Sequence, residues 1–161
     1  MAFEAPIARY STEILPEWTD YNKHLNVAYF VLIFDQATDV FYPLIGLGEP
    51  YRNATGKSTF AVESHITYAK SADEGDIVAV TTQLLGFDDK RIHYFHTMVH
   101  PEEGYQIATL EQLALHVDLA ARKVESMPDK SQRLLAEMTE AHAGLAMPPE
   151  VGSVMGVKRK G

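Results

Sequence analysis

The chain has 161 residues, of which 46% are apolar and 22% charged, and it carries a formal net charge of −8. This composition is typical of one globular domain with a single core. The acidic balance argues against a nucleic-acid partner, because phosphate binding needs a basic face. The lack of cysteine excludes disulfides, thiol nucleophiles and cysteine-based metal sites. Since no apolar run reaches membrane-spanning length and residues 1–10 lack a signal-peptide pattern, we expect a cytoplasmic protein without a membrane partner.

Strand signals surround one very apolar helix. Weak alternation over residues 7–15 predicts a first strand. Residues 26–42 are apolar on nearly every side, which predicts a helix enclosed by other structure and stopped by Pro43 and the following Gly46 and Gly48. A loop is expected over 49–57. Short turns then separate four further predicted strands, at residues 58–69, 77–85, 91–100 and 105–118.

A final amphipathic helix is predicted after Pro128, from the helical spacing of Leu134, Leu135 and Met138. An antiparallel sheet needs one face covered, and only the apolar helix can cover it. We therefore predict an α+β fold, in which a curled antiparallel sheet of about five strands wraps around one long helix, with a C-terminal helix added. Residues 1–147 are assigned to this domain and 148–161 to a flexible tail.

The strand over 58–69 is predicted to have one apolar and one polar face. Glu63 lies on the polar face and is a candidate substrate-binding residue, although a solvated or interface face also explains it. The apolar face is expected to hold Phe60, Val62, Ile66 and Tyr68, and the polar face Glu63, His65 and Thr67.

The densest polar cluster lies just before the apolar helix. Asp20, Asn22, His24 and Asn26 stand there at every second position. One interpretation is capping, in which Asn22 or Asn26 accepts from free backbone N–H groups and Asp20 complements the helix dipole. The other is a catalytic site, because a carboxylate, an amide and an imidazole could activate water against a carbonyl held by helix N–H groups. The two are compatible, since a capped helix start still presents free donors.

The run WTDYNKHLNVAY, residues 18–29, resembles the signature of hotdog-fold acyl-CoA thioesterases of the 4-hydroxybenzoyl-CoA thioesterase type. In that family an Asp precedes a Gly-His-Val-Asn-type sequence at the helix entry, and Asp20 and His24 keep the spacing of four. Lys23 departs from the pattern, because it stands where the family usually has Gly. The resemblance spans roughly residues 7–135. The segments 15–22, 83–86 and 115–118 are similar to thioesterases linked to carnitine and betaine metabolism.

The resemblance implies roles for the residues of this loop. Asp20 matches the catalytic carboxylate, acting as nucleophile or as general base. The backbone N–H of Val27 matches the oxyanion donor, and Asn22 and His24 match positions that hold the loop or the substrate. The substrate-binding candidates are Trp18, Tyr21, Asn26 and Glu63.

The acyl group is expected to be small, and betainyl is one candidate. Trp18 and Tyr21 flank Asp20, and aromatic faces bind quaternary ammonium groups. Packing of Trp18 under the helix entry is an equally good explanation of that residue. We expect no bound cofactor, since coenzyme A enters as part of the substrate.

No metal site is expected. His93, His96 and His100 have metal-like spacing, but in a strand His96 and His100 lie about 13 Å apart at roughly 3.3 Å per residue, too far to share one ion. A homodimer or tetramer is expected, because one sheet on one helix leaves a strand edge exposed.

Two other functions stay open. The first is a non-catalytic acyl-CoA-binding module on the same fold. The second is a hotdog enoyl-CoA hydratase, whose motif places the His five residues after the Asp with an intervening Asn-Pro. This chain has a spacing of four and no Pro after Asn22, which disfavours the hydratase.

Overall fold

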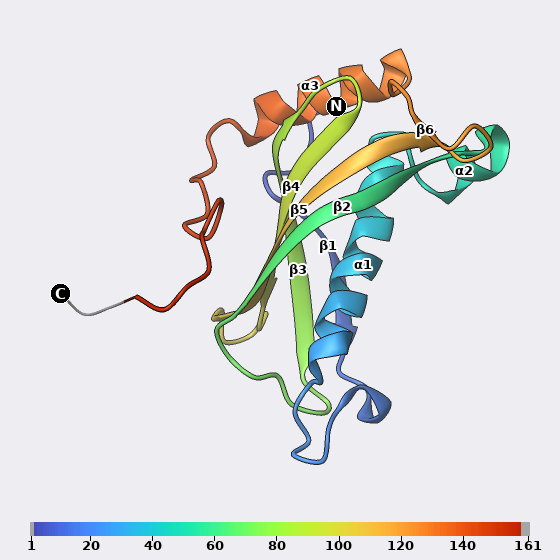
Figure 1. The fold of residues 1–161 in the computed structure, drawn as a ribbon. Coiled ribbons are helices and arrows are strands. Elements are labelled where there is room, and N and C mark those ends of the chain that lie inside the picture. The colour runs from blue at the N-terminus through green and yellow to red at the C-terminus, as the bar shows by residue number, and fades with distance from the viewer. Residues whose placement is uncertain (1, 159–161) are drawn as a thin grey trace.

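The computed structural model describes residues 2–158. Figure 1 shows an antiparallel sheet curled around the long helix α1, with strand order β1-β3-β4-β5-β2 and the short β6 paired with β5. The predicted hotdog architecture is confirmed. The elements are β1 (Ile7–Glu13), α1 (Val27–Leu44), α2 (Glu49–Thr55), β2 (Lys57–Tyr68), β3 (Ile77–Phe87), β4 (Arg91–Val99), β5 (Gln106–Asp118), β6 (Lys123–Val124) and α3 (Asp129–His142), with a single 3-10 turn at Pro16–Trp18.

Helix α1 runs two residues beyond the predicted range, through Pro43 to Leu44, and ends before Gly46 within the predicted stop over residues 43–48. A proline removes only the hydrogen bond to the carbonyl four residues earlier, here that of Asp39. Because α1 ends one residue later, little of the helix depends on that bond.

The prediction of an enclosed α1 is wrong for one stripe. Most of its side chains are buried, but Val27 is 64% and Val31 47% exposed. These residues lie one turn apart, so in the single chain α1 presents an apolar stripe to the outside.

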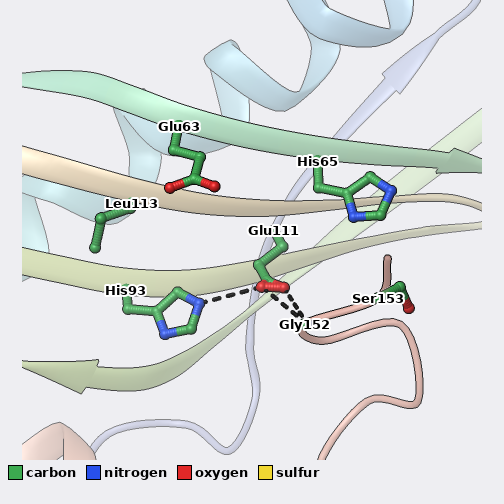
Figure 2. Close-up of a pocket in the computed structure, with 7 residues that line it drawn as sticks. All are labelled: Glu63, His65, His93, Glu111, Leu113, Gly152 and Ser153. Atoms are coloured by element: carbon green, nitrogen blue, oxygen red, sulfur yellow. Dashed lines mark hydrogen bonds and ion pairs between the residues drawn. The ribbon is translucent and has the colours of Figure 1, made fainter. Parts of the chain in front are cut away.

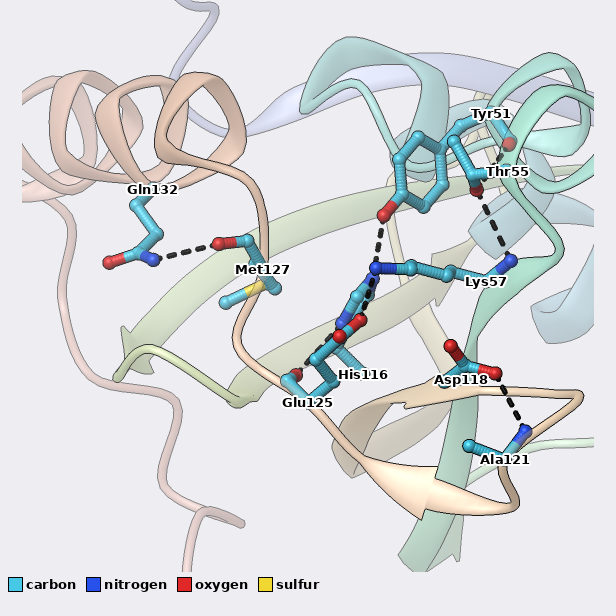
Figure 3. A network of polar contacts seen from close by, with 9 residues as sticks. All are labelled: Tyr51, Thr55, Lys57, His116, Asp118, Ala121, Glu125, Met127 and Gln132. Carbon is cyan, nitrogen blue, oxygen red and sulfur yellow. Dashed lines mark hydrogen bonds and ion pairs between the residues drawn. The ribbon is translucent and has the colours of Figure 1, made fainter.

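Residues 49–55 form helix α2 rather than the predicted loop. Pro50 occupies the first turn, where a proline is favourable, and Gly56 ends the helix with φ of +70°, which suits glycine. The Tyr51 hydroxyl ties α2 to β5 through a hydrogen bond with His116 Nε2 at 2.9 Å (Figure 3).

A β-bulge in β2 overturns the predicted division of its faces at Phe60 and Val62, whereas the division from Glu63 to Tyr68 is confirmed. The register with β5 shifts between Ala61 and Glu63, so Val62 is an extra residue. Phe60 therefore shares the outer face with Glu63 instead of lying with Ile66, which faces α1. Phe60 is 52% and Val62 51% exposed.

The core has two clusters along α1. One lies between the first half of α1 and the sheet, around Phe34 and Ile33. The other lies between the second half of α1, the sheet and α3, around Phe41 and Leu135. Within residues 2–158 no single helix is long and apolar enough to cross a membrane, and only α1 with α2, bent by 65°, pass such a test as a pair.

The segment after α3 returns along the face of the sheet that points away from α1 (Figure 1). The Gln106 side chain donates to Glu150 at 2.9 Å, and the Gly152 N–H donates to Glu111 at 2.6 Å. These contacts position residues 148–152 in the structure. The flexibility of the tail over 148–161 stays a prediction, and its last three residues lie outside the described part of the chain.

Candidate active site

The loop before α1 folds back on itself as a small hairpin. The Asn26 N–H donates to the Trp18 carbonyl at 2.9 Å, Thr19 pairs with Leu25, and the Asp20 N–H donates to the His24 carbonyl at 3.0 Å. Asp20 therefore lies two residue pairs from Asn26, the residue that precedes α1. The predicted catalytic carboxylate and the helix start are thereby brought to the same end of the fold.

Asp20 organises the tip of this hairpin. Its Oδ1 accepts from the Asn22 N–H at 2.8 Å, and its carbonyl accepts from the Lys23 N–H at 3.0 Å. Such a turn leaves the second carboxylate oxygen available to a substrate. The Asn22 side chain is exposed and forms no hydrogen bond with the described residues, so Asn22 contributes to the loop through its backbone N–H.

Lys23 has a left-handed backbone, with φ of +64°. The resemblance predicted a glycine here, and the structure explains why glycine fits: only glycine adopts this conformation without steric cost. Lys23 is held by a hydrogen bond from the Glu74 N–H to its carbonyl at 3.1 Å and by an ion pair to the Glu74 carboxylate at 3.4 Å. The departure from the family pattern therefore leaves the turn intact.

Asn26 caps α1, and Val27 is its first residue. Asn26 Oδ1 accepts from the Ala28 N–H at 3.0 Å, as the capping interpretation predicted. Among the described residues no acceptor lies on the Val27 N–H, which belongs to the first turn, where helix donors lack intrahelical partners. The helix start is thus capped and still offers a donor at its positive end.

The loop between β2 and β3 supports the hairpin. Asp73 Oδ1 lies 2.6 Å from His24 Nδ1, and the Leu25 N–H donates to the Ala72 carbonyl at 2.8 Å. Sequence reasoning missed Asp73, because it lies 49 residues from His24 and no local pattern marks it. His24 therefore contributes to positioning the loop.

The two aromatic candidates are not brought together. Trp18 is buried in the core and stacks on Tyr29, with ring centroids 6.0 Å apart. Tyr21 is 94% exposed at the tip of the hairpin. Trp18 therefore packs under the helix entry, and only Tyr21 offers an accessible ring beside Asp20 in the single chain.

Glu63 lies elsewhere, on the outer face of the sheet. It lines an open cavity of about 360 Å³ together with His65, His93 and Glu111, and no residue of the hairpin lines that cavity (Figure 2). Glu111 there receives the Gly152 N–H and lies 3.3 Å from His93 Nε2. Within one chain the structure does not place Glu63 near Asp20.

The histidines of β4 point to different faces. His93 lies on the outer face, whereas His96 is fully buried beneath α1 between Thr38 and Thr82. Burial lowers the pKa of His96 to about 3, so it is neutral at physiological pH. In the described part of the chain, no three His, Cys, Asp or Glu side chains are grouped to hold a metal ion.

Comparison with known proteins assigns the class. Residues 14–137 match the model of the thioesterase-like superfamily. A betainyl-CoA thioesterase of Pseudomonas aeruginosa is 39% identical, over 94% of this chain and 95% of that protein. An L-carnitine dehydrogenase/betainyl-CoA thioesterase of Rhizobium meliloti is 35% identical, over 96% of this chain but only 31% of the longer protein.

A solved structure supports the fold independently. A hypothetical protein from Staphylococcus aureus, determined in complex with CoA, superposes with a TM-score of 0.90 over 98% of this chain and 99% of that one, at 22% identity. The fold and the loop before α1 define a hotdog-fold thioester hydrolase. The chain belongs to the thioesterase-like superfamily, and the prediction of an acyl-CoA thioesterase is confirmed at the level of that class.

Proposed function

We propose that this protein hydrolyses betainyl-CoA to betaine and free CoA, with Asp20 as the reacting carboxylate. The hairpin over 18–26 is the observation that supports Asp20, because it brings this carboxylate to the same end of the fold as the Val27 N–H, which has no acceptor among residues 2–158. The substrate is suggested by the names of two relatives, each aligned over more than nine-tenths of this chain. The S. aureus neighbour was solved with CoA, which suits a CoA thioester.

Two routes suit the geometry. In one, an Asp20 oxygen attacks the thioester carbon, the CoA thiolate leaves, and water hydrolyses the resulting anhydride. In the other, Asp20 takes a proton from water as the water attacks, and the proton then passes to the departing thiolate. In both routes negative charge develops on the carbonyl oxygen, where the Val27 N–H and the positive end of α1 stabilise it.

We propose that the active form is at least a homodimer paired through β2. This strand is an edge of the sheet, so within residues 2–158 no further strand pairs with its outer side, and the exposed Val27 and Val31 lie on the neighbouring helix. The start of α1 lies beside the end of β2, where Phe30 contacts Tyr68 at 5.1 Å between ring centroids. Helix α1 therefore runs opposite to β2.

That direction fixes what a symmetric pair would bring together. If β2 pairs antiparallel with a second β2, the end of one strand meets the start of the other. The catalytic hairpin of one subunit then approaches the second half of α1 in its partner. Light scattering at micromolar concentration tests this arrangement, and a stable monomer with full activity would contradict it.

The decisive experiment on the site is Asp20→Asn. Asparagine keeps an oxygen for the Asn22 N–H but lacks both basicity and nucleophilicity. We expect kcat for betainyl-CoA to fall by at least about 100-fold while KM changes little, in an assay of thiol release. The matched control is Asp129→Asn, an exposed residue at the start of α3, which should keep full activity.

The same assay separates the alternatives. A folded wild-type protein that binds CoA esters but releases no thiol would be a binding module rather than an enzyme. A near-normal kcat in Asp20→Asn would leave the hairpin as a capping segment and refute the mechanism. The cytoplasmic location stays a prediction.

A further inference from the structure

A cleft lies between the second half of α1, helix α2 and the start of β2. Its volume is about 590 Å³, and none of the hairpin residues 18–26 lines it. Its walls include Asp35, Asp39 and Tyr42 from α1, Glu49 from α2 and Thr59 from β2. At 1.5 Å per residue, Asp39 lies about 18 Å along α1 from Val27. A thioester held beside Val27 of the same chain could not place its acyl group here, whereas the hairpin of a partner could.

The cleft carries an excess of negative charge. Three carboxylates line it, those of Asp35, Asp39 and Glu49, against the single guanidinium of Arg52. Within residues 2–158 none of the three carboxylates forms an ion pair. Asp35 and Asp39 lie one turn apart on α1, where like charges destabilise a helix.

The repulsion affects the pKa of Asp39. Partial burial, together with the charges of Asp35 and Glu49, raises the pKa of this carboxyl above its usual value. A cation placed between these groups would relieve the repulsion. A positively charged ligand in the cleft would therefore lower the electrostatic energy of these three carboxylates.

The remaining lining suits a cation that has no hydrogen-bond donors. Tyr42 contributes an aromatic ring, and Pro43, Leu47 and Pro50 contribute apolar surface. The hydroxyl oxygen of Thr59 is buried in this wall and has no hydrogen-bond partner among the described residues.

The wall formed by α2 is held in place. His116 Nδ1–H donates to the Glu125 carbonyl at 2.8 Å, so His116 Nε2 carries no proton and accepts a hydrogen bond (Figure 3). The donor is the hydroxyl of Tyr51, which lies in α2 between Glu49 and Arg52. His116 is fully buried. The carboxylate of Glu49 is therefore presented by a helix that is fixed to the sheet before any ligand arrives.

We propose that this cleft binds the trimethylammonium group of the substrate, with Asp35, Asp39 and Glu49 as its specificity-determining residues and the partner subunit's Asp20 as the reacting carboxylate. The inference rests on the proposed function. It explains how a thioesterase of this fold selects a cationic acyl group although Trp18 is buried and Tyr21 stands alone.

The test compares two substrates of nearly equal shape. Betainyl-CoA carries a quaternary nitrogen, and 3,3-dimethylbutyryl-CoA carries a carbon in the same place. In the double variant Asp35→Asn/Asp39→Asn, kcat/KM for betainyl-CoA should fall at least about tenfold, mainly through KM, whereas the neutral substrate should lose nothing. The control Glu137→Gln/Glu140→Gln removes the same charge from α3 and should leave both substrates unchanged. Equal losses on both substrates, or an unchanged preference in the variant, would overturn the proposal.

A binding arm separates failure of the cleft from failure of the enzyme. Tetramethylammonium should bind wild-type protein in NMR titrations at matched ionic strength, and the Asp35→Asn/Asp39→Asn variant at least about tenfold more weakly. If wild-type protein hydrolyses neither CoA ester yet binds the ion in this way, the cation site is supported and the proposed function is contradicted. If wild-type protein does not bind the ion, or the variant binds it equally well, the cation site is wrong whatever the activity.

Discussion

Replacing His96 with glutamine should remove a pH-dependent component of the stability of this protein. His96 is fully buried under α1, and its ring stacks on Phe34 at 5.9 Å between centroids. The Thr38 hydroxyl donates to the Phe34 carbonyl at 3.1 Å, so it must accept from His96 Nε2–H. Nδ1 then accepts from the Thr82 hydroxyl at 2.9 Å. Both ring nitrogens are satisfied in the neutral form, and burial disfavours a second proton more than the contact with the Thr81 backbone favours it.

The magnitude follows from the two pKa values. The folded value is about 3, against 6.5 for an ordinary histidine. Between these values the unfolded chain binds a proton that the native protein does not, so stability falls as the pH is lowered. Each pH unit in this window costs about 1.4 kcal/mol, and the change from pH 7 to pH 4.5 amounts to about 2.5 kcal/mol.

The assay is urea unfolding of wild type and His96→Gln between pH 4.5 and pH 7.5, at one protein concentration. Glutamine can hydrogen-bond both threonines but does not titrate, so the variant should be less stable at pH 7 through lost ring packing. The difference in free energy of unfolding between wild type and variant should be about 2.5 kcal/mol smaller at pH 4.5 than at pH 7. The difference between the two proteins cancels the titration of all other groups. Parallel stability curves would refute the argument that His96 stays neutral in the fold.

Three further changes test the loop and the cleft. Lys23→Gly should stabilise the protein by up to about 1 kcal/mol in urea unfolding, because relief of the left-handed strain outweighs the added entropy of the unfolded chain; a clear loss of stability would contradict this. Asn26→Ala should cost about 1 kcal/mol by the same measurement through loss of the α1 cap, and an unchanged midpoint would show that the cap contributes nothing. Asp39→Asn should stabilise the protein by about 0.2–0.5 kcal/mol at pH 7. Since the pKa of Asp39 is raised in the fold, this gain should appear as the pH rises through about 4 and vanish below it, and a gain independent of pH would argue against repulsion by Asp35 and Glu49.

Local patterns predicted the elements whose interactions are local. The strands joined by tight turns, the apolar α1 and the cap at Asn26 all depend on neighbours within a few residues, and each is present in the structure. The hairpin before α1 was foreseen only as a cluster of polar residues. Its geometry depends on Ala72 and Asp73, which are distant in sequence, so no pattern within the loop could supply them.

The β2 errors have a different origin. Alternation assumes one residue per step of the partner strand, and the extra residue at Val62 breaks that assumption without any glycine or proline to mark it. Phe60, which precedes the bulge, is therefore assigned to the wrong face. Helix α2 was missed because seven residues are too few for a periodic signal, although Pro50 and Gly56 stood at its two ends.

The exposed stripe of α1 links assembly to specificity. Val27, Val31, Asp35 and Asp39 follow one another at intervals of four, so they lie on the same side of the helix. The first two expose apolar surface beside the edge strand, and the last two line the cleft. The apolar patch favours association with a second copy of the chain. The two carboxylates on the same side, which form no ion pair within residues 2–158, oppose association unless a cation lies between them. In a symmetric dimer, each cleft would lie opposite the partner's hairpin, so a cationic acyl group would offset the charge in the place where its thioester meets Asp20. Substrate recognition and subunit pairing would then depend on the same face of one helix.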